Sequence, residues 1–303
     1  MSTAPPIRRL VSHSSIPVDL ALAVPHLPER GGDVLATRSG RTAGGGFNVL
    51  SAAVRLGLPA VYAGQHGTGP FGDMVREALA GEGIACLQPI NSELDTGYTV
   101  VLLEGGERTF VTASGADGVV GHDALRDIAY QAGDAVFFSG YDLAYPGSAI
   151  AIADHAAALP ADILLVFDPG PLVAEIAPAS LRPVLERTDL LSLNSREFEL
   201  LAVSRAYLRP WATIVVRAGA GDTTVIAPSR PHQTIPAVAT RVIDSTGAGD
   251  VHVGAMLAGL SRGLELPVAV LLANRAAAYA VGQWGAAAGP TQDQLDEFGA
   301  GRW

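Results

Sequence analysis

The amino-acid sequence predicts an α/β protein with a doubly wound, mostly parallel β-sheet flanked by helices, and with a small second β-sheet. Short apolar segments of strand length alternate with Ala- and Leu-rich amphipathic stretches of helix length. Apolar strands that alternate with helices are typical of a parallel sheet covered on both faces. Two segments, 16–43 and 96–114, break this alternation and are the candidates for the second sheet.

The predicted elements follow one another along the chain, and we expect residues 1–303 to form one domain. Strands are expected at 60–64, 134–140, 163–168, 189–193, 213–217 and 223–227. Helices are expected at 46–56, 71–82, 147–158, 195–203, 247–262 and 267–282. In the first helix, Phe47, Leu50 and Val54 share one face, and Gly57 is a typical C-terminal stop.

The segment 96–114 has the pattern of a β-hairpin. The stretches TVVLLE and RTFVTA flank Gly105 and Gly106, and apolar and polar residues partly alternate in them. This pattern fits a hairpin in a separate small sheet and equally a hairpin at the edge of the main sheet.

Composition excludes several classes of function. The twenty basic residues are all arginine, so the lysine of a P-loop and the lysine of a protein kinase are both absent. A formal net charge of −10 argues against a nucleic-acid partner. No apolar run has the length of a membrane span, and the first ten residues lack the apolar core of a signal peptide. We therefore expect a cytoplasmic protein without a membrane partner.

The stretch DSTGAGD, 244–250, is the most informative local pattern. It is a Gly-rich turn that enters the predicted helix 247–262, with Asp250 in the first helical turn. Such turns often only connect elements, and the helix dipole alone favours an acid there. The alternative is an anion hole, because small residues let backbone N–H groups approach an anion closely.

Polar residues follow several of the predicted strands. Asp168 and Asn194 each come after an apolar run, and Gly44 to Gly46 open the helix at 46–56. In an open parallel sheet, ligands bind beyond the carboxyl ends of the strands. We therefore expect these groups and the 244–250 turn to meet in one crevice.

These motifs resemble those of the PfkB-type carbohydrate kinases, the ribokinase-like sugar and nucleoside kinases, in order along nearly the whole chain. The matching stretches are AGGGFNVLSAAVRLG (43–57), PFGDMVREALAGEGI (70–84), NSRE (194–197), DSTGAGDVHVGA (244–255) and NRAAAYAVGQWGA (274–286). The resemblance implies a ribokinase-like fold and transfer of the γ-phosphoryl group of ATP to a primary hydroxyl of a sugar-like substrate.

The resemblance also implies roles for single residues. Asp250 matches the catalytic base, and the amides of Gly247, Ala248 and Gly249 match the anion hole. Positions that bind sugar hydroxyls in the family correspond to Asp19, Gly44, Gly45 and Asn48. Asp19 and Asn48 are equally compatible with a turn acid and a polar residue at a helix start.

Cofactor positions follow from the same resemblance. Mg²⁺ is implied with ATP, and Asn194 and Glu197 match the motif that holds the metal, largely through water. The same two residues form the pattern of a helix capping box. Nucleotide positions correspond to Asn194, Gly219, Gly221 and Asn274. Arg217 stands where the family often has another residue; we expect it to contact ATP phosphates in place of the missing lysines, and an exposed position is the alternative. Carbonyls around Asp244, Ser245 and Gly285 are candidates for K⁺ or another monovalent cation.

Segments 16–43 and 96–114 correspond to the family's β-lid, which excludes water as a competing acceptor. Lids of two subunits pair in several members, so a homodimer is expected. His252 replaces a Phe of the motif, and we interpret it as a packing residue.

Two rival functions remain open at this point. One is a nucleoside kinase, in which Phe47 could stack on a base. The other is a catalytically silent sugar-binding protein on the same fold. Retention of Asp250 favours an enzyme, because a binding protein needs no base.

Overall fold

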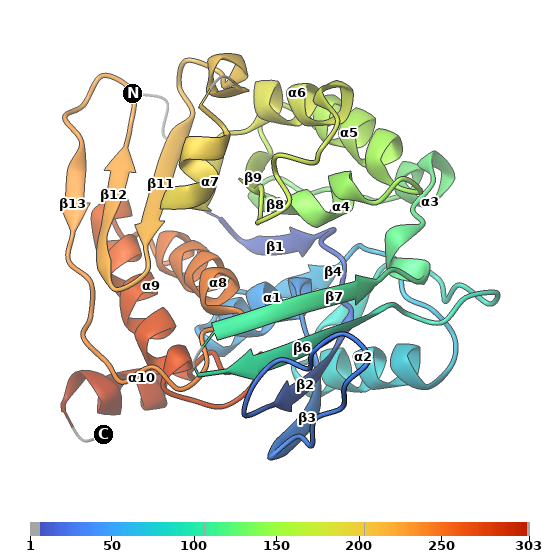
Figure 1. The fold of residues 1–303 in the computed structure, drawn as a ribbon. Coiled ribbons are helices and arrows are strands. Elements are labelled where there is room, and N and C mark those ends of the chain that lie inside the picture. The colour runs from blue at the N-terminus through green and yellow to red at the C-terminus, as the bar shows by residue number, and fades with distance from the viewer. Residues whose placement is uncertain (1–6, 106, 203, 302–303) are drawn as a thin grey trace.

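The computed structural model describes residues 7–105, 107–202 and 204–301, and its strands form two separate sheets (Figure 1). Gly106, in the predicted hairpin turn, and residue 203, the predicted end of a helix, lie outside the described residues. None of the described helices combines the length and apolar character needed to cross a membrane.

The larger sheet has nine strands. Its order is β13 (Gln233–Ile235), β12 (Gly221–Ile226), β11 (Thr213–Ala218), β10 (Leu190–Asn194), β9 (Leu164–Asp168), β8 (Asp134–Ser139), β1 (Arg9–Ser12), β4 (Ala60–Tyr62) and β5 (Ala85–Cys86). Every pair from β11 to β5 is parallel, and β12 and β13 continue the sheet in antiparallel pairing. The predicted mostly parallel sheet is confirmed.

Helices cover both faces of this sheet. One face carries α1 (Gly46–Arg55), α2 (Pro70–Gly81), α8 (Ala248–Ser261), α9 (Leu266–Val281) and α10 (Gln292–Gly299). The other carries α3 (His122–Arg126), α4 (Gly140–Ala144), α5 (Ala149–Ala158), α6 (Pro178–Arg187) and α7 (Ser195–Leu200). Neighbouring strand residues point to opposite faces. Phe137 therefore lies in the first core and Phe138 in the second.

Some elements differ from the sequence prediction. Strand β1 was not predicted because its four residues, RLVS, are too few to show a pattern. Helix α6 was missed because Pro183 lies inside it, where proline removes a backbone donor and is disfavoured. Its other proline, Pro178, lies at the start of the helix, where proline is well tolerated.

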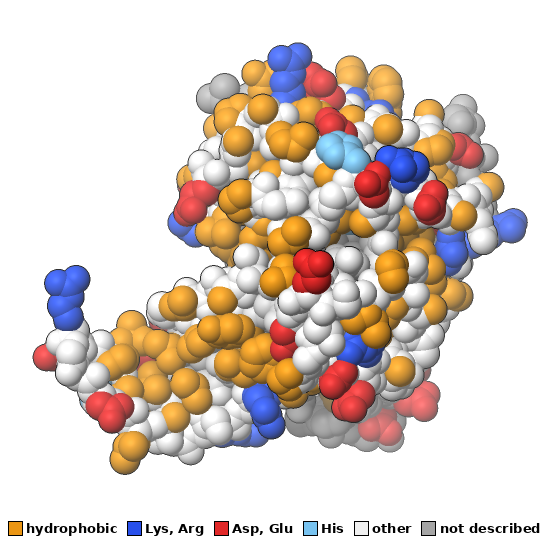
Figure 2. All heavy atoms as spheres, turned by 90° about the vertical axis from the view of Figure 1, so that its right-hand side faces the viewer, with side chains coloured by type: hydrophobic (Ala, Val, Ile, Leu, Met, Phe, Trp, Pro, Cys, Tyr) orange, Lys and Arg blue, Asp and Glu red, His pale blue; other side chains and the backbone are white. Residues whose placement is uncertain are grey.

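The predicted second sheet is separate from the main one, which decides between the two arrangements left open for segment 96–114. It has the order β3 (Arg38–Ala43), β2 (Val18–Ala23), β6 (Tyr98–Glu104) and β7 (Glu107–Ala113). Figure 2 shows it as an arm that protrudes from the body, with a hollow between the two and hydrophobic side chains gathered on the arm. Exposed apolar residues of this sheet include Tyr98, Phe110 and Val111.

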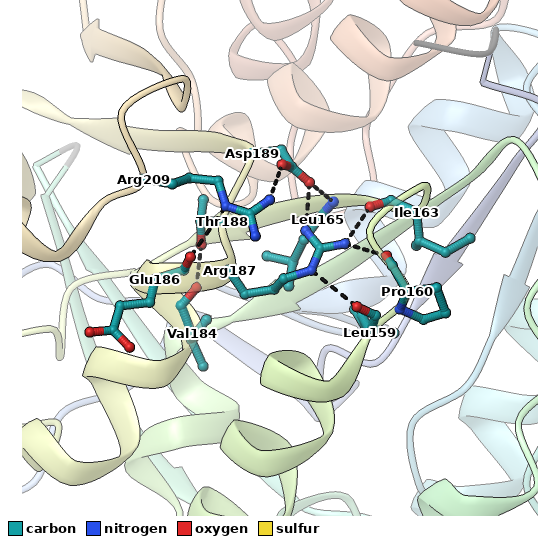
Figure 3. Close-up of polar contacts among 10 residues, drawn as sticks. All are labelled: Leu159, Pro160, Ile163, Leu165, Val184, Glu186, Arg187, Thr188, Asp189 and Arg209. Carbon is teal, nitrogen blue, oxygen red and sulfur yellow. Dashed lines mark hydrogen bonds and ion pairs between the residues drawn. The ribbon is translucent and has the colours of Figure 1, made fainter.

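At the edge of the main sheet where β9, β10 and β11 begin, charged side chains bind the loops that precede these strands (Figure 3). Arg187 donates to Asp189 at 2.8 Å and to the carbonyls of Leu159, Pro160 and Ile163. Arg209 donates to the other oxygen of Asp189 at 2.7 Å. This cluster, here called the amino-edge cluster, joins the loops that precede the three strands.

Candidate active site

A cleft of about 320 Å³ lies at the carboxyl ends of the parallel strands, a size within the range of small-molecule sites. Ten of the predicted site residues line it: Asp19, Gly45, Asn48, Asn194, Glu197, Arg217, Gly247, Ala248, Gly249 and Asp250. Gly44, Gly219, Gly221 and Asn274 do not belong to its lining. Segments 200 residues apart in sequence thus meet at one place, as the positions of polar residues after the strands predicted.

The amino end of α8 faces this cleft. Gly247 caps the helix in a left-handed conformation, with φ of 72°, and Ala248 N–H makes one long bond of 3.3 Å to the carbonyl of Ser245. Among the described residues, the N–H groups of Gly247 and Gly249 have no hydrogen-bond acceptor. Unpaired N–H groups at a helix start attract anions.

The two glycines are also required by contacts inside the protein. A Cβ at Gly247 would come within 2.7 Å of Nδ2 of Asn48, and a Cβ at Gly249 would come within 3.0 Å of the Arg217 guanidinium. The small residues of the turn therefore serve close packing as well as access to the cleft.

Asp250 lies in the first turn of α8, beside these N–H groups. Its Oδ2 accepts a hydrogen bond of 3.1 Å from Nδ2 of Asn48. Burial, together with the negative charge of nearby Asp168, raises the pKa of Asp250 to about 7. A carboxylate with this pKa is a better proton acceptor near neutral pH than an ordinary Asp.

Asp19 reaches the same cleft from β2. Burial and the charges of Asp250 and Asp244 raise the pKa of Asp19 to about 7. Gly44 lies directly over it, because a Cβ at Gly44 would be 2.2 Å from Oδ2 of Asp19. Gly44 thus supports the site by its lack of a side chain, although it does not line the cleft.

Asn48, on α1, has polar capacity left for a ligand. Its Nδ2 donates to Asp250, whereas its Oδ1 is buried without a hydrogen-bond partner among the described residues. Buried polar atoms normally have partners, so an unpaired oxygen in a cleft wall is a position for a donor such as a hydroxyl group.

Arg217 lies beneath the α8 terminus and does not face solvent; its side chain is 13% exposed. Its guanidinium donates to Asp168 at 2.8 Å and to the carbonyl of Gly249 at 3.0 Å, and lies 3.9 Å from Glu197. Asp168 was expected in the crevice as a polar residue after a strand but was given no role there; it does line the cleft. The structure adds it as the ion-pair partner of Arg217.

Asn194 and Glu197 form the capping box of α7. The Asn194 side chain accepts from the Glu197 N–H at 2.9 Å, and Glu197 Oε2 accepts from the Asn194 N–H at 2.7 Å. Burial and the charge of Asp168 raise the pKa of Glu197 to about 7. Both residues also line the cleft, so the capping box holds their side chains in place beside it.

The other predicted nucleotide positions lie away from the cleft lining. Gly219 and Gly221 are exposed in the hairpin between β11 and β12. Asn274 is buried, and its side chain bonds Thr223, His252 and the carbonyl of Pro236. Burial lowers the pKa of His252 to about 3, as expected for a neutral packing residue.

Around the candidate cation site, Asp244 organises the turn before α8. Its Oδ1 accepts from the N–H and hydroxyl of Thr246, and its Oδ2 accepts from the N–H of Gly285 at 3.1 Å. Ser245 lines the cleft and uses its carbonyl to accept from Ala248. The three segments named in the sequence prediction therefore lie together.

Several cleft residues were missed by sequence reasoning: Ser14, Ser15, Thr99, Arg108, Phe110, Thr112, Tyr141 and Tyr145. Four of them lie on the hairpin of the small sheet, where alternation marked two faces but not which one meets the body. Phe47, considered for base stacking, is buried in the core and does not line the cleft.

Comparison with known proteins agrees with this geometry. A family model described as pfkB family carbohydrate kinase matches residues 8–293. The chain belongs to this family. It is 34% identical over 283 residues to the uncharacterized sugar kinase YegV of Escherichia coli (strain K12), covering 89% of this chain and 87% of that protein.

Solved structures have the same fold. Ribokinase from Giardia lamblia superposes with a TM-score of 0.80 at 20% identity, covering 96% of this chain and 99% of that one. Aminoimidazole riboside kinase from Salmonella enterica, complexed with aminoimidazole riboside and an ATP analog, gives a TM-score of 0.79 at 22% identity, with coverage of 96% and 99%. The protein is therefore a carbohydrate kinase with the ribokinase fold.

Proposed function

We propose that this kinase transfers the γ-phosphoryl group of ATP to a primary hydroxyl of a sugar or sugar-like substrate, with Asp250 as the base. One observation carries the proposal. The carboxylate of Asp250 and unpaired N–H groups of the α8 terminus line the same cleft. A proton acceptor next to an anion site is the pair of functions that phosphoryl transfer to an alcohol requires.

In the proposed step, the hydroxyl oxygen forms a bond to the γ-phosphorus while the bond from that phosphorus to the β–γ bridging oxygen breaks. ADP leaves with the electrons of the broken bond, and the hydroxyl proton passes to Asp250. The N–H groups of Gly247, Ala248 and Gly249 stabilise the charge on the transferring phosphoryl oxygens. Ala248 shifts from its long bond with Ser245 to do so.

Asp19 and Asn48 position the acceptor. Each has oxygen atoms in or beside the cleft, and Asn48 Oδ1 has no partner of its own among the described residues. Carboxylate and amide groups suit neighbouring hydroxyls, because each can take part in two hydrogen bonds. Gly44 and Gly45 bring the start of α1 close to these groups.

Magnesium fits the donor set at the other end of the cleft. The described residues hold no cluster of three or more His, Cys, Asp or Glu side chains suited to a metal. Mg²⁺ commonly takes only one or two protein carboxylates and keeps waters and nucleotide phosphates. Glu197 and Asn194 would hold it through water, and the ion would neutralise charge on the triphosphate.

For the nucleotide, we propose that Arg217 stands behind the phosphates and that the hairpin with Gly219 and Gly221 lies along the ribose and adenine. The polar atoms of Asn274 are engaged within the protein, so we propose that it shapes this region through β12 and α8. Carbonyls near Asp244, Ser245 and Gly285 remain candidates for a K⁺ site.

The small sheet is proposed to act as the lid that excludes water, and the exposed apolar residues on its other face, such as Val111, to pair with a second subunit. A cytoplasmic location remains a prediction of the sequence.

A nucleoside acceptor is the second candidate. The aromatic residues Phe110, Tyr141 and Tyr145 line the cleft and could stack on a base. Comparing nucleosides with sugars as acceptors separates the two candidates.

The test is coupled ADP release with sugars, sugar acids, sugar phosphates and nucleosides as acceptors. Asp250→Asn should lower kcat by about 10²- to 10⁴-fold with the best acceptor, because a general base contributes that much. Asp293→Asn, an exposed acid in the first turn of α10, is the matched control and should leave kcat unchanged. Full activity of Asp250→Asn would refute the assigned base, and no ADP release with any acceptor would favour a silent binding protein.

A further inference from the structure

Arg108 enters the cleft from the arm of the molecule. Alternate residues of a strand share one face, and Arg108, Phe110 and Thr112 of β7 all line the cleft. The same face of the small sheet presents Asp19 from β2 and Thr99 from β6, both of which line the cleft too.

Arg108 has no partner for its charge among the residues the structure describes. Its Nε is buried without a hydrogen-bond partner, and the guanidinium makes only a distant contact with Phe110, 5.9 Å from the ring centre. The other basic residue of the cleft, Arg217, is paired with Asp168. By contrast, the guanidinium carbon of Arg38, on β3 of the same sheet, lies 4.2 Å from the ring centre of Trp284, so this charge has an aromatic partner.

The register of the small sheet shows where this charge lies relative to the reacting end. Asp19 pairs with Thr99, and Thr99 pairs with Thr112, which makes one polar row across the sheet. Arg108 is four residues before Thr112 on the same strand, so its Cα lies about 13 Å further along. Phe110 occupies the position between them. Along β7, this face of the small sheet therefore changes from the polar row of Asp19, Thr99 and Thr112, past the apolar ring of Phe110, to the positive charge of Arg108.

We propose that the phosphoryl acceptor carries an acidic group, a carboxylate or a phosphate, at the end remote from its reacting alcohol, and that Arg108 binds this group. The proposal rests on the proposed kinase function and names the class of its substrate. A planar guanidinium matches both carboxylate and phosphate with two parallel hydrogen bonds. An acidic acceptor supplies the partner that Arg108 lacks.

Binding at this end also suits the charge of the cleft. Asp19 and Asp250 would repel an acidic group near the reacting alcohol, so the acid is directed to the far end. Neutral hydroxyls then face the carboxylates, and the anion faces the guanidinium. Arg108 thus sets both the substrate class and its direction in the cleft.

The experiment compares matched acceptors, each with a free primary hydroxyl: gluconate with glucitol, and fructose 6-phosphate with fructose. We expect a preference for at least one acidic member, measured as kcat/KM. Arg108→Gln should lower kcat/KM for that member by about 10- to 100-fold and leave its neutral partner nearly unchanged, since it removes charge-assisted hydrogen bonds. Arg108→Lys should recover part of the loss.

The matched control is Arg41→Gln. Arg41 is exposed on β3 opposite Leu20, in a row next to that of Asp19 and therefore on the other face of the same sheet. It should keep the wild-type preference. The KM for ATP should not change in Arg108→Gln.

Two results would overturn the proposal. One is equal use of acidic and neutral members by the wild type. The other is a rise in the KM for ATP that is the same with every acceptor, which would assign Arg108 to the nucleotide. If no acceptor yields ADP, the proposed kinase function fails instead, and calorimetric binding to Asp250→Asn decides about Arg108. Tighter binding of an acidic member supports its role, and equal binding refutes it.

Discussion

Two arginine–carboxylate clusters lie at opposite edges of the same three strands, β9, β10 and β11. At the amino ends, in the amino-edge cluster, two arginines share one carboxylate, and backbone carbonyls accept the remaining donors of Arg187 (Figure 3). At the carboxyl ends the balance is reversed, because one arginine, Arg217, stands among Asp168, Glu197 and Asp250.

The difference teaches how to distinguish a structural cluster from a reactive one. In the amino-edge cluster each charge has protein partners, so it holds loops together and has little capacity for a ligand. At the carboxyl edge, negative charge is in excess, carboxyl pKa values are raised, and the N–H groups of Gly247 and Gly249 have no acceptor in the part of the chain that the structure describes. An excess of unsatisfied groups in a cleft is typical of a binding or catalytic site.

The largest expected effect tests the structural cluster. Arg187→Met should lower the free energy of unfolding by about 3–5 kcal/mol, because it leaves three carbonyls without their donor and removes one of the two arginine partners of Asp189. Urea denaturation measures this, and kcat of the folded variant should not change. Arg182→Met removes an exposed pair with Glu186 one turn earlier and should have little effect. A lower kcat in folded Arg187→Met would contradict the purely structural role of the amino-edge cluster.

The next effect tests the reactive carboxyl edge by comparing a substitution at the amino end of α8 with a control beyond the other end of that helix. Gly247→Ala should lower kcat by about 10²- to 10³-fold, since the new Cβ would displace Asn48 and the N–H groups of the turn. Gly263→Ala, beyond the other end of the helix, is the control. It has the same left-handed backbone, with φ of 77°, but open space around a Cβ. Equal loss of activity in both variants would indicate backbone strain alone.

The smallest effect is a dependence on pH. Glu197 and Asp250 have pKa values raised to about 7, so the folded protein keeps their protons up to a higher pH than the unfolded chain does. The free energy of unfolding should therefore fall as pH rises from about 4 to about 7, with a slope of at most about 1.4 kcal/mol per pH unit for each group. Over the same range kcat/KM should rise, because the carboxylate form of Asp250 is the base.

A free energy of unfolding that falls with rising pH while kcat/KM rises would strengthen the distinction between the structural and the reactive cluster. Asp250→Asn should flatten the fall in stability, measured by denaturation at several pH values. A rise in stability over this range would contradict the raised pKa values.

Much of the fold was predictable because its signals are local. Apolar segments of strand length marked six strands, and Gly-rich turns marked the starts of α1 and α8. Two of the elements missed have weak or contradictory local signals: the four-residue β1 and α6 with its internal Pro183. Strand β1 is too short to show a pattern, and in α6 the internal proline argued against the helical spacing of Leu181, Val184 and Leu185, so tertiary packing decides both.

The candidate site divides in the same way. Asp250 and the 247–249 turn were predictable because helix entry and small residues are adjacent in sequence. Arg108 was not, because it carries no motif and the hairpin pattern does not indicate which face meets the body. Asp168 was visible after a strand, but its pairing with Arg217 depends on the order of strands in the sheet.

The sequence alone determined the class of sheet, the exclusion of lysine-based phosphate binding and the position of the turn before α8, since each depends on residues close together in the chain. Only the tertiary structure decided which charges are neutralised and which are left for a ligand. Charge pairing depends on distances between side chains from separate strands and helices. Those distances are set by how the whole chain packs.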